Sequence, residues 1–226
     1  MYWDSTIIIL IPAIIFSIAA QIMVKSAFSE YSKVRNSRGL TGADAAREIL
    51  DRNGLSNVRI EHISGSLTDH YDPKANVIRL SDDVYGSATV AAVGVAAHEA
   101  GHAVQYAEGY YPIKIRNAII PVTRFGSSLS TPLVILGLVL SLDFLITAGI
   151  LLFCAVVLFQ AITLPVEFNA SGRALKTLRS SHFLEDDEMK GARSVLTAAA
   201  MTYVAAMLSA LLSLVRLLVI SGRRRR

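Results

Sequence analysis

Four apolar stretches constrain the fold of this 226-residue chain more than any other feature of its sequence. They cover residues 6–24, 118–142, 144–164 and 195–220. A transmembrane helix needs about 20 consecutive, mostly apolar residues, and each stretch is close to or above that length. Apolar residues make up 53% of the chain, which is high for a soluble domain. We therefore predict a mainly α-helical integral membrane protein with about four transmembrane or membrane-associated helices.

The first stretch could be an anchor or a cleaved signal peptide. A signal peptide carries basic residues before its apolar core, and the leading segment "MYWDS" has none, so we expect an uncleaved anchor. The stretches and the segments between them predict five regions. These are an N-terminal anchor (1–24), a catalytic region (25–117), a transmembrane hairpin (118–164), a cytosolic segment (165–193) and a C-terminal membrane helix with a basic tail (194–226).

The net charge of +4 comes from residues in or beside the apolar stretches. Residues 25–117 hold 11 basic and 11 acidic residues, and residues 165–193 hold five of each. A nucleic-acid-binding face would concentrate positive charge on a folded surface, so we expect no nucleic-acid partner. The expected partners are the lipid bilayer and a peptide or protein substrate, with membrane proteins among the candidates.

Basic residues that flank apolar stretches predict the orientation in the membrane, because they mark the cytoplasmic side. Lys25, Lys33 and Arg35 follow the first stretch, and no basic residue precedes it. We therefore expect residues 25–117 and 165–193 to face the cytoplasm of a bacterial plasma membrane. The terminal run 223–226, "RRRR", disagrees, because a full crossing by the last stretch would place it outside. Either that segment is incomplete or re-entrant, or the rule fails there.

The catalytic region begins with a short helix and a small sheet. Thr41 is the expected N-cap of the helix, Asp44 lies at the capping-box distance, and Gly54 is the stop signal. The alternating segment "NVRIEHIS" and the β-branched segment "NVIRLS" predict two or three antiparallel strands. "NVIRLS", residues 76–81, is the candidate exposed edge, to which an extended peptide could add as a further strand. A purely structural strand is the alternative.

A longer helix is predicted over residues 88–107, with Ser87 as its cap, and it carries the pentapeptide HEAGH. His98 and His102 are four residues apart, so they share one helix face and can bind one metal ion. In the H-E-x-x-H pattern of metalloproteases two histidines bind zinc, and the glutamate, here Glu99, is the general base. The apolar run before His98 is only about eight residues long, which favours a buried core helix over a membrane span.

A catalytic zinc ion needs a third protein ligand. Cys154 is the single cysteine of the chain, so a thiolate site is excluded and the ligands must be imidazole and carboxylate. Glu167 in "LPVEFNAS" is the main candidate, because it follows the third apolar stretch on the expected cytoplasmic side, where Pro165 suits the start of a new helical segment. The acidic cluster 185–188 is a weaker candidate, typical of a solvated loop.

Several segments, in order along most of the chain, resemble the YugP-like family of neutral zinc membrane metallopeptidases. They are "LTDHYDP", "VIRLS", "VAAHEAGHAVQ", "LPVEFNAS" and "LTAAAMTYVAA". The resemblance implies a zincin-like, membrane-embedded protease with one zinc ion, ligands His98, His102 and Glu167, and Glu99 as the base. It also implies a distant similarity to gluzincin proteases of the HtpX and CAAX-processing type.

Those gluzincins often carry an aspartate four residues after the glutamate ligand, where it orients a zinc histidine. This chain has Ser171 at that position and Asn169 nearby, so the supporting residue stays open between them. A donor for the oxyanion of the tetrahedral intermediate is also required. The candidates are His70, Arg173, His182 and Tyr203.

Two functions fit these observations. The first is a membrane-bound zinc endopeptidase that hydrolyses peptide bonds. The second is a non-catalytic membrane scaffold with a structural zinc site. Structural zinc is closed by four protein ligands, and the sequence offers no clear fourth, which favours the endopeptidase.

Overall fold

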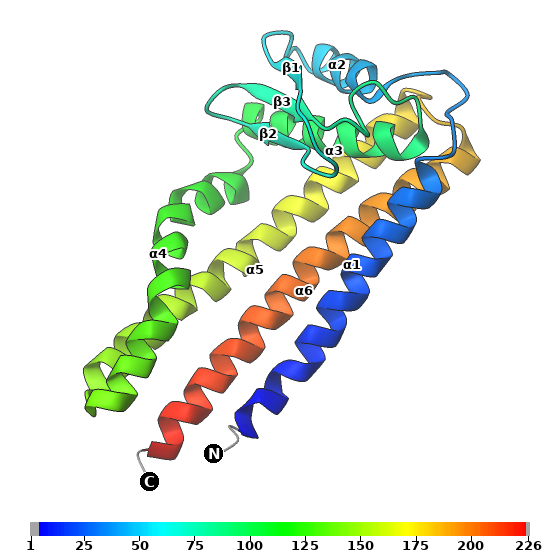
Figure 1. Cartoon of the computed structure of the whole chain (residues 1–226). Coiled ribbons are helices and arrows are strands. Elements are labelled where there is room, and N and C mark those ends of the chain that lie inside the picture. The colour runs from blue at the N-terminus through cyan, green and yellow to red at the C-terminus, as the bar shows by residue number, and fades with distance from the viewer. Residues whose placement is uncertain (1–4, 225–226) are drawn as a thin grey trace. The chain divides into compact units, whose positions relative to one another are not determined.

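The computed structural model describes residues 5–224. A 3-10 helix (Ser5–Leu10) runs into the first of six α-helices, and three short strands lie between the second and third helices. In chain order the elements are α1 (Ile11–Tyr31), α2 (Gly42–Arg52), β1 (Arg59–His62), β2 (His70–Asp72), β3 (Val77–Leu80), α3 (Val90–Ala107), α4 (Tyr111–Leu140), α5 (Asp143–Ser180) and α6 (Asp186–Arg224) (Figure 1).

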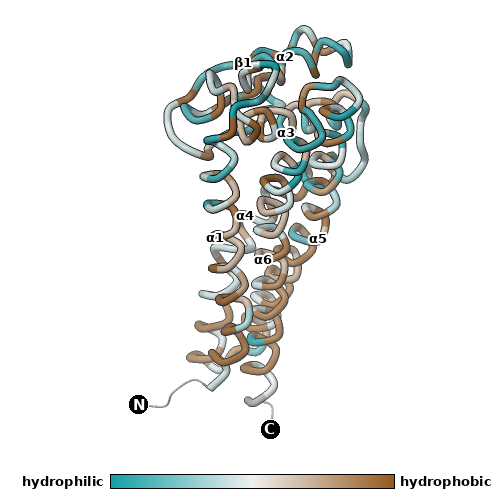
Figure 2. The backbone as a smooth tube through the Cα atoms, turned by 90° about the vertical axis from the view of Figure 1, so that its right-hand side faces the viewer, coloured by the Kyte–Doolittle hydropathy of each residue, from teal (hydrophilic) through white to brown (hydrophobic). Residues whose placement is uncertain are grey.

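Four of the helices are long and apolar enough to cross a membrane. They are the helix Ser5–Tyr31, α4, α5 and the part of α6 up to Gly222. Figure 2 shows hydrophobic residues along most of these helices and hydrophilic residues around β1 and α2. The mainly helical membrane protein predicted from the sequence is confirmed. Among the described residues, α3 does not belong to this group, which agrees with its prediction as a core helix.

The long helices extend beyond the apolar stretches that predicted them, and α5 and α6 extend furthest. The helix α5 has 38 residues, about 57 Å at 1.5 Å per residue, and a bilayer core is about 30 Å thick. Pro165 lies inside α5, so the expectation that it opens a new segment is wrong. The helix α6 is unbroken from Asp186, which argues against a re-entrant turn. Prolines are tolerated in long membrane helices because neighbouring groups satisfy the freed carbonyl.

Two compact units share these helices. The first comprises residues 1–20, 112–165 and 202–226, and the second comprises residues 21–111 and 166–201. In the first unit α4 and α5 form the predicted hairpin, and glycine allows them to pack closely. A Cβ added to Gly149 would lie 2.6 Å from the carbonyl oxygen of Ser130, so no larger residue fits there without a shift. Arg216 donates a hydrogen bond of 3.1 Å to Thr6 in this unit.

The second unit has α3 at its centre. Val90, Ala92, Ala96 and Ala100 are fully buried along this helix, and α2 packs against it. The capping box predicted for α2 is confirmed, because Thr41 accepts from the Asp44 amide and Asp44 accepts from the Thr41 amide. The predicted cap of α3 is wrong by two residues. Thr89 accepts from the Ala92 amide, and Ser87 lies before the helix.

The three strands form a mixed sheet in the order β1-β3-β2. The strand β3 pairs in parallel with β1 and antiparallel with β2, so the expected all-antiparallel sheet is wrong. The expectation of an exposed edge at residues 76–81 is also wrong, because β3 is the central strand. Val77, Ile78 and Leu80 are fully buried, which explains why this apolar strand takes the middle position. The edge strands are β1 and β2.

Candidate metal centre

Three side chains from two helices converge in the second unit. His98 and His102 project from successive turns of α3, and Glu167 projects from α5. The Oε2 atom of Glu167 lies 3.3 Å from Nε2 of His98 and 3.4 Å from Nε2 of His102. The Glu167 side chain is only 2% exposed. The structure therefore brings together the residues expected to be the two histidine ligands and the third ligand.

The donor set fits zinc in kind and in geometry. One imidazole or carboxylate atom from each of the three residues lies within 4.8 Å of the others. Zinc–nitrogen and zinc–oxygen bonds of about 2.0–2.2 Å in a tetrahedron place their donor atoms about 3.3–3.5 Å apart. The two distances from Glu167 to the histidines agree with that spacing. Two neutral imidazoles and one carboxylate also leave one tetrahedral position for water or substrate, as in catalytic zinc sites.

The helices α3 and α5 approach closely at this point because Gly101 has no side chain. A Cβ added there would lie 2.8 Å from the carbonyl oxygen of Ala170. Gly101 directly precedes His102, and Ala170 is three residues after Glu167. The small residues within HEAGH thus allow the α5 backbone to come near enough for Glu167 to reach both histidines.

Gln105 supports His102 from the same helix. Its side chain is completely buried, and its Oε1 atom lies 3.0 Å from Nδ1 of His102. The Gln105 Nε2 group donates to the Val166 carbonyl and to Oδ1 of Asn169, each at 2.9 Å. Because both amide hydrogens are used, Oε1 must accept from the His102 Nδ1–H group. This arrangement leaves the lone pair on Nε2 free to bind a metal.

Ser171 supports the other histidine. Its Oγ atom lies 3.1 Å from Nδ1 of His98, and Ser171 lies one helical turn after Glu167 on α5. Residues four apart share a helix face, so one face of α5 presents both a candidate ligand and a supporting hydroxyl. Both residues considered for this role contact the centre, because Ser171 lies against His98 and Asn169 reaches His102 through Gln105.

Arg173 and Asn169 belong to this supporting network. The Arg173 Nε group donates to Asn169 Oδ1 at 2.7 Å, and the Arg173 guanidinium pairs with Glu108 at 2.7 Å. Both Asn169 and Arg173 line a cavity of about 670 Å³ that His98, Glu99 and Glu167 do not line. Their contacts favour a supporting role over the oxyanion role expected for Arg173.

Glu99 is buried and is adjacent in sequence to His98 of the centre. Its residue is 8% exposed, and it makes no hydrogen bond or ion pair with another residue in the range 5–222. The charge of Glu99 acts on a second carboxylate, Asp69. Burial raises the pKa of Asp69, the Glu99 charge raises it further, and hydrogen bonds from Ser81 oppose the rise. Glu99 is therefore not held in a structural salt bridge among the described side chains.

The pKa of His102 reflects its two acidic neighbours. Burial lowers the pKa of the imidazole, but hydrogen bonding to Glu167 and the charges of Glu99 and Glu167 outweigh burial and raise it. A site with this much negative charge around two imidazoles attracts a cation.

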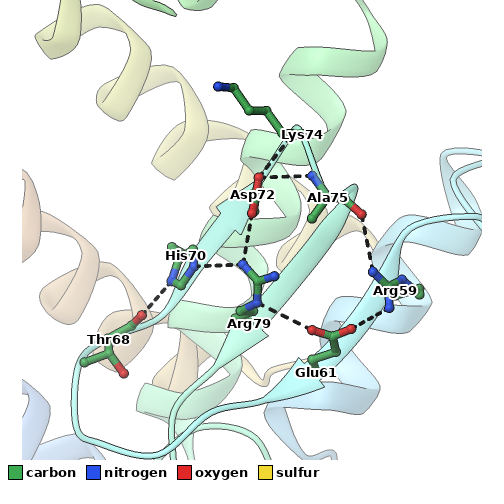
Figure 3. A network of polar contacts seen from close by, with 8 residues as sticks. All are labelled: Arg59, Glu61, Thr68, His70, Asp72, Lys74, Ala75 and Arg79. Atoms are coloured by element: carbon green, nitrogen blue, oxygen red, sulfur yellow. Dashed lines mark hydrogen bonds and ion pairs between the residues drawn. The ribbon is translucent and has the colours of Figure 1, made fainter. Parts of the chain in front are cut away.

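His70 lies in a network on the sheet (Figure 3). Its Nδ1 atom is 2.9 Å from the Thr68 carbonyl, and its Nε2 atom is 3.5 Å from the Arg79 guanidinium. Arg79 also pairs with Asp72 at 3.0 Å and with Glu61 at 3.4 Å. Through these contacts His70 helps to stabilise the sheet.

The two remaining expected donors are Tyr203 and His182. Tyr203 lies on α6 in the first unit, and the His182 carbonyl accepts a hydrogen bond from Arg38. Sequence reasoning missed Gln105. Its position three residues after His102 was the available signal, since such pairs meet on a helix.

A buried two-histidine, one-glutamate centre, in a chain with four membrane-length helices, defines the class as a membrane protein with a candidate metal site. The sequence model of a family described as "Putative neutral zinc metallopeptidase" matches residues 6–222. A Bacillus subtilis (strain 168) protein described as "Putative membrane protease YugP" is 49% identical over 214 residues, and the match covers 95% of each chain. No solved structure matches the chain. The chain therefore belongs to this zinc metallopeptidase family, which confirms the resemblance seen in the sequence.

Proposed function

We propose that the protein is a membrane-bound, zinc-dependent endopeptidase. One observation carries the proposal. His98, His102 and Glu167 form a buried three-donor centre with the spacing of a tetrahedral zinc site, and Glu99 lies beside it without a structural partner among the described residues. The family match supports zinc as the metal and peptide hydrolysis as the reaction.

The residues divide the chemistry among them. His98, His102 and Glu167 would hold one zinc ion, with Gln105 and Ser171 fixing the two imidazoles. When bound there, zinc lowers the pKa of a water and polarises the carbonyl of the scissile peptide bond. Glu99 accepts the proton of the attacking water and delivers it to the leaving amine nitrogen. A glutamine at this position could not accept that proton.

A structural zinc site is the second candidate function. Structural sites are closed by four protein ligands. The described part of the chain gathers three metal-binding side chains at this point. Glu99 has no partner that would explain a carboxylate in an alanine-rich core, whereas a general base explains it. Both observations favour catalysis over scaffolding.

The membrane setting supports cleavage near the bilayer surface. The apolar stretch of α5 from Phe144 to Leu164 has about 21 residues, enough for about 31 Å of helix. Glu167 follows it by three residues. With the charge distribution, this supports an active site at the cytoplasmic face of a bacterial plasma membrane. The edge strand β2, which packs near α3 through Tyr71 and Tyr106 at 5.5 Å, is our proposed docking strand for an extended peptide.

Glu99→Gln tests the proposal directly. Purified wild type and variant, loaded with zinc in detergent, are assayed for cleavage of casein as an unstructured substrate. We expect the variant to keep its zinc and to lose about 10²–10⁴-fold of the cleavage rate, the usual contribution of a general base. Asp51→Asn, a change to an exposed acid on α2, is the matched control and should cleave like the wild type. Equal cleavage by Glu99→Gln and wild type would contradict the endopeptidase assignment.

A further inference from the structure

A second cavity lies within the second unit, away from the metal centre. It has a volume of about 910 Å³, and its walls come from the end of α1, the end of α5 and the first turns of α6. An adjoining cavity of about 610 Å³ shares Arg179, Met189 and Arg193 with it. Neither lining includes His98, Glu99, His102 or Glu167, so the cavities do not belong to the proposed active site.

The charged part of the lining carries an excess of cations. Arg179, Lys190 and Arg193 line the larger cavity, and Lys176, Arg179 and Arg193 line the adjoining one. Lys190 is neutralised by Asp187 at 2.6 Å. Arg179 and Arg193 form no ion pair with any residue in the described range 5–222. After the Lys190 pair is set aside, the two adjoining cavities together present three cations, Lys176, Arg179 and Arg193, and two carboxylates, Glu30 and Asp186.

The remaining lining is both hydroxylated and apolar. Ser26, Ser194 and Thr197 bring hydroxyl groups into the larger cavity. Ile22 and Met23 line it as well, and they are 62% and 48% exposed. An aqueous surface would not favour such large exposed apolar groups next to arginines, whereas the boundary between lipid tails and headgroups suits both.

The position along each helix agrees with that boundary. The apolar stretch of α1 ends at Val24, and the cavity takes residues 22–30 of that helix. The apolar stretch of α6 begins near Val195, and the cavity takes residues 186–198. The lining therefore covers the transition from charged to apolar sequence in both helices, which is where a lipid headgroup lies.

We propose that this cavity binds the headgroup of an anionic phospholipid, phosphatidylglycerol. Arg179 and Arg193 donate to the phosphate, for which guanidinium groups are well shaped. The glycerol hydroxyls donate to Glu30 and Asp186, and the acyl chains continue along Ile22 and Met23. The net positive charge of the two adjoining linings, which includes Lys176, favours a headgroup with net negative charge over a zwitterionic one. This site is independent of the proposed peptidase chemistry.

The test measures lipid binding to the full chain purified in detergent. Dioleoyl phosphatidylglycerol is titrated into wild type, the Arg179→Gln/Arg193→Gln variant and the control Arg59→Gln/Lys74→Gln, which removes two cations from the small sheet. Native mass spectrometry counts bound lipid, and the thermal unfolding midpoint is followed in parallel. We expect saturable binding of one lipid to wild type and control, with affinity reduced about tenfold or more in the cavity variant.

Two further probes separate the sources of the phosphate group. Dioleoyl phosphatidylcholine carries the phosphate without hydroxyl donors or net charge and should bind at least about tenfold more weakly. Inorganic phosphate at the same concentration should not raise the unfolding midpoint. Equal binding of the two lipids, unchanged affinity in the cavity variant, or an equal effect of inorganic phosphate would each overturn the proposal. If the double variant fails to fold, Arg193→Lys replaces it. We expect Arg193→Lys to bind the lipid with an affinity between those of wild type and Arg193→Gln. An affinity equal to that of wild type would overturn the proposal.

Discussion

The Oε1 atom of Gln105 lies 3.0 Å from the Nδ1 atom of His102, and both residues are on α3. The contact determines which imidazole nitrogen carries the proton, because the amide nitrogen of Gln105 already donates to Val166 and Asn169. Helix α3 thus supplies a candidate ligand together with the group that orients it. Outer contacts of this kind commonly change metal affinity by about 10–100-fold when they are removed.

Gln105→Leu should weaken zinc binding by about 10–100-fold and lower the stability of the protein. Leucine fills a similar volume but leaves the His102 Nδ1–H without its acceptor next to a fully buried position, at about 1–3 kcal/mol. Zinc affinity is measured by chelator competition, and stability by thermal unfolding of the metal-free protein. Gln21→Leu, an exposed change on α1, is the control and should leave affinity unchanged. Wild-type zinc affinity in Gln105→Leu would show that the contact does not orient His102.

Glu167→Ala should reduce bound zinc as much as His98→Ala does. Both changes remove one of three proposed donors and leave a two-donor site. Bound zinc is counted by elemental analysis after dialysis against a fixed free-zinc concentration. Glu185→Ala removes an acid of the 185–188 cluster, the other candidate source of a ligand, and should keep the wild-type content. If Glu167→Ala kept its zinc and Glu185→Ala lost it, the third ligand would belong to the acidic cluster.

The sequence was sufficient for the parts of the fold and site that depend on local patterns. Apolar length identified the membrane helices, and helical spacing identified the two histidines. Glu167 could be ranked first because it follows the third apolar stretch on the expected cytoplasmic side. The distance between Glu167 and His98 depends on how α3 and α5 cross, and residue spacing along the sequence does not give that crossing.

Features set by packing were not accessible in the same way. The middle position of β3 depends on burial of Val77, Ile78 and Leu80 within the second unit. The unbroken course of α5 through Pro165 depends on neighbouring groups around that residue. The role of Gln105 depends on the carbonyl of Val166, 61 residues away. Each is a tertiary effect that overrides a local sequence signal. For β3 that signal favoured an edge strand, for Pro165 a helix start, and for Gln105 a solvated amide.

Gly101→Ala should destabilise the protein even though alanine favours helices more than glycine does. The added Cβ would lie 2.8 Å from the Ala170 carbonyl oxygen, so α3 and α5 must separate. Overpacking of this kind costs about 1–3 kcal/mol, against a helix-propensity gain of about 1 kcal/mol. The separation should also weaken zinc binding, because Glu167 moves with α5. The measurements are the thermal unfolding midpoint and zinc affinity.

Gly172→Ala is the matched control for that substitution. It lies on α5 near the same crossing, and a Cβ added there meets no atom within 4 Å. The helix-propensity gain should therefore be realised in full, so the midpoint should rise or stay unchanged. Equal behaviour of the two variants would show that close approach at Gly101 is not what places Glu167.

Asp72→Asn should remove a pH-dependent part of the stability. Hydrogen bonds from the Ala75 amide and from Arg79 hold the pKa of Asp72 below its ordinary value (Figure 3). A carboxyl whose pKa is lower in the folded than in the unfolded state stabilises the fold above its unfolded pKa of about 3.9. That contribution is lost as the pH falls through the folded pKa. The wild type should therefore have a higher unfolding midpoint than Asp72→Asn at pH 6, and the difference should shrink as the pH approaches 3. A difference that is constant from pH 6 to pH 3 would mean that Asp72 acts through packing and not through its charge.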